Sequence, residues 1–183
     1  MSVQARATVD SLYCVPENGK AELVEGGLRR MSPTGALPGR AATKIVAALM
    51  IHEERGVGGY AFGDNVGFLV DLPGRESFSP DAAWYVGAVG GMDFLSGAPA
   101  FAVEIRSKND YGPSAERAME RKRADYFAAG TEVVWDVDLL SDDVVRVYRH
   151  ASPVHPTIYR SGDLAEAEPA VPGWTMPVDD LFR

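Results

Sequence analysis

The chain has 183 residues, 46% hydrophobic and 24% charged, which is typical of a soluble globular protein and suits one domain over residues 1–183. No apolar run approaches the roughly 20 residues that span a bilayer, and residues 1–6 lack the apolar core of a signal peptide. One Cys excludes an internal disulfide and, with only three His, argues against a structural zinc site. We therefore expect a cytoplasmic protein with no membrane partner.

The net charge of −8 and the pI of about 4.9 argue against a general nucleic-acid binder. Residues 101–130 nevertheless carry six basic side chains against five acids, and a second basic group comprises Arg29, Arg30, Arg40 and Lys44. Such local patches can contact phosphate in an acidic chain. The basic residues at 117–123 can equally form a solvated helix face with neighbouring acids, and the sequence leaves both interpretations open.

The first 80 residues predict two helices and four strands. The expected elements are, in order, a helix over 9–14, a turn at 16–19, strands over 21–25 and 28–31 around Gly26-Gly27, a loop over 32–39, an amphipathic helix over 40–55 ended by Gly56, strands over 59–62 and 66–70, and a turn at 72–75. The inward face of the long helix is expected to be Ala41, Ile45, Ala48, Leu49 and His52.

The second half predicts strands over 81–86 and 101–107 separated by a Gly-rich loop, then a helix over 114–129 that ends at a left-handed Gly130. Strands over 133–137 and 144–148 follow, with a short strand near Ile158 and a tail to residue 183. Strand, helix and strand over 101–137 indicate a parallel pair joined by a crossover. The expected fold is α/β (α+β), a central mixed sheet flanked by helices with extra antiparallel hairpins.

Lys122 lies in the middle of the otherwise apolar inward stripe of the helix at 114–129. A Lys on such a stripe often extends its ammonium to water along the protein surface, and that interpretation is open. A buried ammonium instead needs an anionic partner. Asp81 and Glu104, each in a strand-like segment upstream, are the two candidates.

Asp81 and Glu104 are hard oxygen donors suited to Mg²⁺ or Mn²⁺. Strand alternation puts Glu104 on the same face as small Ala102, which leaves room for a metal ion. A bound metal would activate water and neutralise a scissile phosphate, and a Lys beside it would stabilise the transition state. Without a metal, the two carboxylates would repel each other, and one would take up a proton or pair with Lys122.

These residues stand in a wider series of motifs. In order they are Glu22-Leu-Val-Glu-Gly26, Met31-Ser-Pro33, Asp64-Asn-Val-Gly-Phe68, Ser79-Pro-Asp81, Val103-Glu-Ile-x-Ser107, Lys122-x3-Tyr126-x3-Gly130, Val134-Trp-x-Val-Asp138, Pro172-Gly-Trp174 and Leu181-Phe182. Over about residues 8–183 the series resembles the PD-(D/E)XK nuclease superfamily, and within it a large bacterial group of restriction-endonuclease-like proteins.

The resemblance implies a restriction-endonuclease-like core. It implies that Asp81 and Glu104 are metal ligands, that the Ile105 carbonyl adds a third ligand, that Lys122 is a catalytic Lys carried on the helix, and that Glu22 is an upstream acid near the metal. Two positions depart from the pattern. Pro38 stands where the group often has a His, and Arg106, two positions after Glu104, is expected either to support or to replace the Lys.

The first functional prediction is a Mg²⁺- or Mn²⁺-dependent endonuclease that hydrolyses DNA. The alternative is a weakly active or inactive nuclease-fold module that binds nucleic acid or a protein, which the acidic pI favours. An enzyme acting on small substrates has no motif behind it, because the chain lacks a phosphate-binding Gly-Lys-Ser/Thr loop and a Gly-x-Ser-x-Gly elbow. The sequence also leaves a homodimer open.

Overall fold

A computed structural model describes residues 6–183; residues 1–5, which the single-domain prediction includes, lie outside this range. The elements, in chain order, are α1 (Val9–Tyr13), the 3-10 helix η1 (Pro16–Asn18), β1 (Ala21–Val24), β2 (Gly27–Arg30), α2 (Ala36–Glu53), β3 (Tyr60–Gly63), β4 (Phe68–Leu72), β5 (Arg75–Phe78), β6 (Ala82–Tyr85), β7 (Leu95–Ser96), β8 (Phe101–Ile105), α3 (Pro113–Ala128), β9 (Val133–Val137), β10 (Val145–Arg149), β11 (Ser152–Tyr159), β12 (Leu164–Glu166), β13 (Thr175–Pro177) and the 3-10 helix η2 (Val178–Phe182).

A six-stranded sheet in the order β11-β10-β9-β8-β6-β3 forms the centre of the molecule. Its only parallel pair among the described residues is β8 with β9, in a register that sets Glu104 opposite Asp136. Helix α3 connects this pair, so the predicted crossover is confirmed. The other neighbours are antiparallel, and the sheet is mixed as expected.

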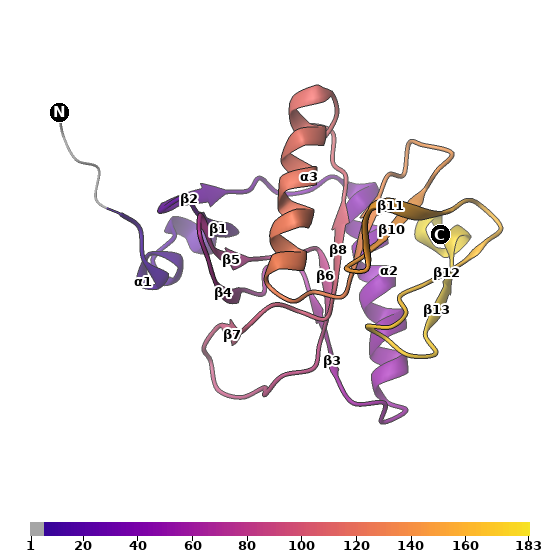
Figure 1. The fold of residues 1–183 in the computed structure, drawn as a ribbon, viewed down its shortest axis with the longest axis horizontal. Helices are drawn as coiled ribbons and strands as arrows, with labels where there is room; N and C mark the ends of the chain where they lie inside the picture. Colours follow the sequence, from indigo (N-terminus) through magenta and orange to yellow (C-terminus); the bar gives the residue numbers. More distant parts are fainter. Residues whose placement is uncertain (1–5) are drawn as a thin grey trace.

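The two long helices cover opposite faces of this sheet (Figure 1). Phe101, Val103 and Ile105 share one hydrophobic cluster with the buried side of α2, whereas Ala102 shares the other with Tyr126 of α3. The predicted alternation along β8 is therefore confirmed, and it directs Glu104 toward α3. Of the inward positions predicted for α2, Ala41, Ile45, Leu49 and His52 are buried, and Ala48 is half-buried against the same cluster.

A second, five-stranded sheet in the order β2-β1-β5-β4-β7 lies beside α3 on the side of the N-terminal segment (Figure 1). The hairpin of β1 and β2 around Gly26-Gly27 was expected. Strands β5 and β7 were not: β5 begins at Arg75, in the predicted turn, and the two residues of β7 lie in the predicted Gly-rich loop. Both pair with β4, so their extended conformation comes from tertiary pairing rather than from local pattern.

The sequence predicted the end of α3 correctly but not the start of α2. Helix α2 begins at Ala36, four residues before the predicted start, because Pro38 fits in the first turn, where a backbone N–H is not needed. Helix α3 ends as predicted at Gly130, whose φ of 102° is left-handed. The N–H of Thr131 donates to the Tyr126 carbonyl (3.0 Å) and that of Gly130 to Phe127 (3.1 Å), a Schellman motif.

The C-terminal region contains more regular secondary structure than the sequence predicted. The strand predicted near Ile158 is the eight-residue edge strand β11, whose two prolines are tolerated at a sheet edge. The tail forms a separate two-stranded pair, β12 with β13, and Trp174 packs on Phe101 and Trp135. No helix within residues 6–183 is both long and apolar enough to cross a membrane.

Candidate active site

Lys122 of α3 is held by two glutamates from two different sheets. Its Nζ lies 2.7 Å from Oε1 and 2.8 Å from Oε2 of Glu104, which β8 directs toward α3. The same ammonium lies 2.9 Å from Oε1 of Glu22 in β1. Only 11% of the Lys122 side chain is exposed, so its charge is met by carboxylates and not by water. The structure thus shows a buried ion-paired Lys and not one extended to solvent.

Asp81 immediately precedes β6, next to the backbone that carries Glu104. Its N–H donates to the Val103 carbonyl (3.0 Å), and its Oδ2 accepts the N–H of Ile105 (2.7 Å). These bonds continue the antiparallel pairing of β6 with β8, in which Ala82 is opposite Val103. The structure therefore brings Asp81, Glu104, Lys122 and Glu22 to one place where the two sheets meet α3.

The cluster shifts the ionisation of its members. Burial raises the pKa of Glu104 above its ordinary value, and the charges of Asp81 and Glu22 add to this despite the attraction of Lys122. Burial alone would lower the pKa of Lys122, but the attraction of both glutamates outweighs it and holds the pKa above the ordinary 10.5. Lys122 is therefore a stable cation at neutral pH.

Two polar neighbours that were not predicted as site residues, Tyr126 and Arg75, complete the cluster. The Tyr126 hydroxyl donates to Oε1 of Glu104 (2.6 Å), and the Tyr126 ring stacks on Phe78 with centroids 4.0 Å apart. Arg75 of β5 donates to Oε2 of Glu22 (2.9 Å) and to Asp125 (2.7 Å). Tyr126 was visible as the residue one turn after Lys122 on the same stripe. Arg75 gave no signal, because β5 itself was not predicted.

Lys20 is the third residue that the sequence analysis missed. Its ammonium lies 2.5 Å from Oδ1 of Asp64 and 3.1 Å from Oδ1 of Asp81. Burial opposes its charge, but the attraction of Asp81, Glu104 and Asp64 is greater, so the pKa of Lys20 is raised. Lys20 is thus an internal cation beside the predicted metal ligands, and its position depends on a tertiary contact that no local pattern reports.

Arg106 belongs to a neighbouring cluster. Its guanidinium contacts both carboxylate oxygens of buried Asp136 at 2.8 Å and pairs with Glu116. Arg123 is also buried, 3.3 Å from Asp136 and over the Tyr148 ring. These contacts direct Arg106 to Asp136 and Glu116 and not to the carboxylates at Lys122. Arg117 and Arg121 alone of the predicted basic helix face are exposed.

The donor set can be compared with what a metal ion requires. Within residues 6–183, no three His, Cys, Asp or Glu side chains are grouped closely enough to hold a metal by themselves. Mg²⁺ commonly takes one or two carboxylates and fills its shell with water and substrate oxygens. Asp81 and Glu104 are two carboxylates of that kind, and in the structure each is paired with an ammonium group, Asp81 with Lys20 and Glu104 with Lys122.

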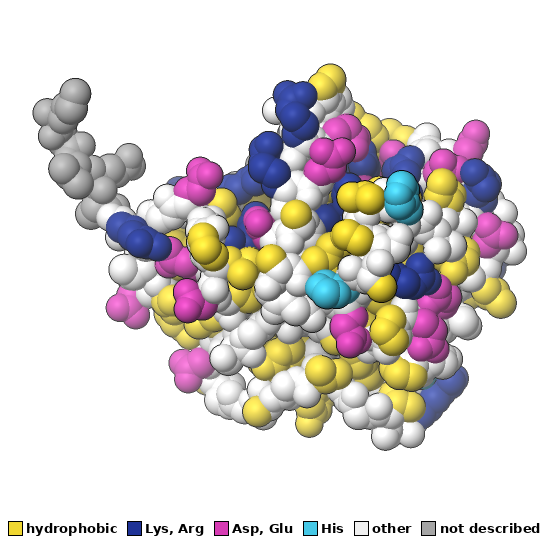
Figure 2. Space-filling model, viewed as in Figure 1, with side chains coloured by type: hydrophobic (Ala, Val, Ile, Leu, Met, Phe, Trp, Pro, Cys, Tyr) yellow, Lys and Arg dark blue, Asp and Glu magenta, His cyan; other side chains and the backbone are white. Residues whose placement is uncertain are grey.

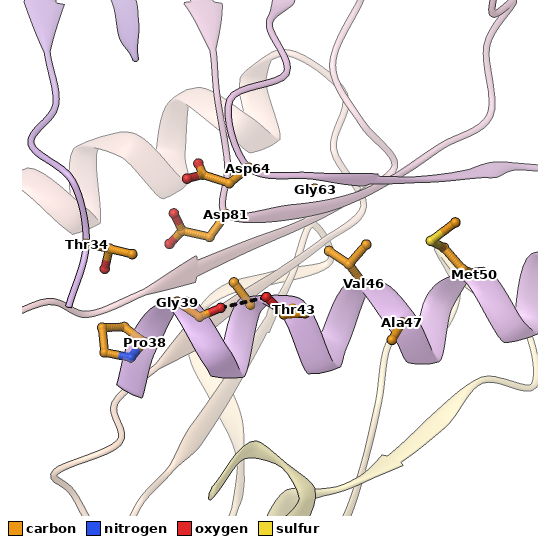
Figure 3. A pocket seen from close by; sticks show the side chains of 11 residues that line it. Thr34, Pro38, Gly39, Thr43, Val46, Ala47, Met50, Gly63, Asp64 and Asp81 are labelled. Atoms are coloured by element: carbon orange, nitrogen blue, oxygen red, sulfur yellow. Dashed lines mark hydrogen bonds between the residues drawn. The ribbon is translucent and has the colours of Figure 1, made fainter. Parts of the chain in front are cut away.

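A cleft of about 400 Å³ opens beside Asp81, between α2 and the β3 end of the central sheet (Figure 3). Asp64 and Asp81 lie side by side at one end of it, opposite the first turn of α2. Farther along, Val46 and Met50 project from α2 (Figure 3). The full lining is Thr34, Pro38, Gly39, Ala42, Thr43, Val46, Ala47, Met50, Gly63, Asp64 and Asp81.

Comparison with known proteins gives three findings. The family model described as "Putative restriction endonuclease" (Uma2) matches residues 8–179. A solved structure of a "putative nuclease belonging to DUF820" from Anabaena variabilis has a TM-score of 0.73 and 18% identity, covering 96% of this chain and 97% of that one. No curated protein matches.

The structural likeness shows that the fold is shared with that DUF820 protein, which agrees with the superfamily resemblance expected from the motifs. The family match spans nearly the whole described chain, and it includes Glu22, Asp81, Glu104 and Lys122. The protein therefore belongs to the Uma2 family of putative restriction endonucleases.

Proposed function

We propose that the protein is a Mg²⁺- or Mn²⁺-dependent endonuclease that hydrolyses phosphodiester bonds in DNA. The observation that carries the proposal is the burial of the Lys122 ammonium between Glu104 and Glu22, with Asp81 bound to the adjacent Ile105 N–H. Family membership supports a nuclease. Asp81 and Glu104 would hold the metal, which when bound supplies an activated water and charge neutralisation at the phosphate.

Lys122 acts as a fixed positive charge in this proposal. The attraction of Glu104 and Glu22 raises its pKa, so in this proposal it acts as a charged hydrogen-bond donor and not as a general base. It can donate hydrogen bonds to the attacking water or to the negative charge that develops on the phosphate oxygens. Tyr126, whose pKa is raised well above 10.0 by burial, stays neutral and holds Glu104 in place through its hydroxyl.

Glu22 positions Lys122 and does not need to reach the substrate. Its two oxygens accept from Lys122, Arg75 and the Ser79 N–H, so three of its roughly four lone-pair positions are used within the protein. We propose that Glu22 fixes the Lys122 ammonium between β1 and β8. Arg106, committed to Asp136 and Glu116, stabilises the neighbouring strand end in this proposal and does not replace the Lys.

The second candidate function is a nuclease-fold module that binds nucleic acid or a protein without cutting. The net charge of −8 favours it, and so do the ammonium partners that Lys20 and Lys122 already supply to both predicted metal ligands.

We further propose a homodimer and a cytoplasmic location under either function. The location is consistent with the exposed free Cys14, which needs no oxidising compartment.

The test is DNA cleavage by purified protein in Mg²⁺ or Mn²⁺ at low salt. Asp81→Asn and Lys122→Met should each lower the rate at least about 100-fold, the usual loss when a transition-state partner is removed. Lys108→Met is the matched control, because Lys108 is exposed outside the cluster. Circular dichroism of each variant would show that it is folded. Wild-type protein that binds DNA and never cuts it would favour the second candidate.

A further inference from the structure

The cleft beside Asp81 has an unusual distribution of polarity. Its walls are uncharged and largely aliphatic, from Ala42, Val46, Ala47 and Met50 on α2 and Gly63 on β3. Its charged lining residues, Asp64 and Asp81, both lie at one end (Figure 3). No Lys or Arg of the described chain lines it, although a groove that follows a phosphate backbone needs such cations.

The size of the cleft suits one small group. Its volume of about 400 Å³ is within the usual range for small-ligand sites. At Gly63 the walls are almost in contact, since a Cβ added there would lie 3.7 Å from the Val46 side chain, so a ring cannot lie between these two residues. A double helix is far too wide for this space, whereas a single base can lie against the aliphatic side chains of α2 on either side of that point.

Two hydroxyls give the cleft a limited capacity for hydrogen bonding. Thr43 donates its hydroxyl proton to the Gly39 carbonyl (2.9 Å), so its oxygen is left to accept. Thr34 lines the same end of α2, close enough that a Cβ on Gly39 would lie 3.2 Å from its methyl carbon. Such groups can meet the polar edge of a base without demanding one particular base.

We propose that this cleft seats one unpaired nucleobase of the DNA strand that is cut, while the phosphate attached to it lies at Asp81. The inference rests on the proposed nuclease function and adds a substrate class to it: single strands, or duplexes with an unpaired or extruded nucleotide. Aliphatic walls bury the face of the base, and the acidic end holds the phosphate only through a cation. A base taken out of the stack into an apolar pocket is a general solution for enzymes that must reach one nucleotide.

The test compares an intact single strand with an abasic strand of the same length, by fluorescence anisotropy in Ca²⁺, a hard cation that carboxylate sites also accept. Wild-type protein should bind the intact strand at least about fivefold more tightly, the usual effect of one well-packed base. Thr43→Leu and Gly63→Ala narrow the cleft from its two walls and should reduce this ratio. Leu is preferred to an aromatic residue, since a ring could stack on the base.

The two filling variants are expected to fold. Thr43 is exposed, and the added methyl at Gly63 meets Val46 at ordinary contact distance. Ala128→Leu, at an exposed position on α3, is the matched control and should keep the wild-type ratio. Equal binding of intact and abasic strands, or unchanged ratios in both filling variants, would overturn the inference.

A cleavage assay distinguishes failure of the nuclease proposal from failure of the cleft inference. Wild-type protein should cut a duplex with one unpaired nucleotide faster than the fully paired duplex. Cutting of both at the same rate would leave the nuclease proposal standing and remove the cleft inference. Absence of binding and of cutting on every DNA form would remove both.

Discussion

At the scale of residues, each carboxylate of the buried cluster has a cation of its own. Glu104 pairs with Lys122, Asp81 with Lys20, and Glu22 with Arg75 as well as Lys122. A buried charge is tolerated in this way only while its partner is present, because removal of one partner leaves the other uncompensated. The cluster is therefore sensitive to single substitutions that would be harmless on the surface.

Glu22→Gln should destabilise the fold in a pH-dependent way. Although burial alone would raise the pKa of Glu22, Lys122 and Arg75 hold it below the ordinary 4.5. A depressed carboxyl pKa adds stability above the unfolded-state pKa, and this stability is lost as the pH falls through the folded-state value. We expect a loss of about 3 kcal/mol in the free energy of unfolding at pH 7. The deficit should shrink below about pH 4.5.

Urea unfolding followed by Trp fluorescence at pH 7 and pH 4 measures this deficit, with the exposed Glu120→Gln as the control. A deficit of the same size at both pH values would show that the Glu22 charge is not its cause.

Lys20→Met should tighten the binding of Mn²⁺. The Lys20 ammonium lies 3.1 Å from Asp81 and attracts the same carboxylate that is proposed to hold the metal. Unit charges a few ångströms apart interact by about 1 kcal/mol even in water, so removing this competitor should lower the Kd at least about fivefold. Calorimetry with Mn²⁺ measures the change, and Lys108→Met controls for the loss of one positive charge. Weaker binding by Lys20→Met would show that Lys20 holds Asp81 in place for the metal and does not compete with it.

At the scale of elements, local pattern was sufficient where an element has a strong period or a specific end. The buried face of α2, the alternation in β8 and the left-handed Gly130 followed from spacing and residue type alone. Lys122 was identified because it interrupts an apolar stripe. The start of α2, strand β5 and strand β7 were missed, because their conformations depend on a proline tolerated in the first turn or on pairing with β4. Arg75 lies on one of these elements, β5, and gave no local signal for that reason. Lys20 lies beside the correctly predicted β1 and was missed because its contact with Asp64 and Asp81 is tertiary.

Gly130→Ala should destabilise the end of α3 by about 1 kcal/mol, since an L side chain is strained at a left-handed φ. The strain falls on the turn that includes Tyr126, whose carbonyl closes the Schellman motif. Thermal unfolding measures the loss. Gly90→Ala is the control, because a Cβ there meets open space and its backbone needs no positive φ. Equal melting temperatures for the two variants would argue against a strained cap.

At the scale of the whole molecule, the acidic net charge coexists with exposed basic residues on α3. Figure 2 shows Lys and Arg side chains gathered near the upper part of α3 among scattered acids. Arg117 and Arg121 are the exposed arginines of that helix. With so few cations available, binding to DNA should rest on a small number of phosphate contacts.

DNA affinity should accordingly fall as salt rises, with a logarithmic slope of about −0.7 to −0.9 for each phosphate contacted. Arg117→Ala together with Arg121→Ala should reduce the steepness of the slope by about 1 to 2 if both contact phosphate. Anisotropy titrations at several salt concentrations measure the slope, with Lys108→Ala alone as the comparison. A double variant with the wild-type slope would assign both arginines to the solvated helix face.

Helix α3 also determines how the molecule can unfold. Its side chains pair with Glu22 and Arg75 in the five-stranded sheet and with Glu104 and Asp136 in the six-stranded sheet. If either sheet separated from α3, the charged side chains of that sheet and their partners on the helix would lose each other. Buried charges left without a partner are costly. Partial opening along α3 is therefore disfavoured, and the two sheets are expected to unfold together as one cooperative unit. An insertion of one residue in α3 before Lys122 would turn Lys122, Arg123 and Asp125 by about 100° relative to the start of the helix, so the length of this helix is constrained more tightly than the length of the loops around it.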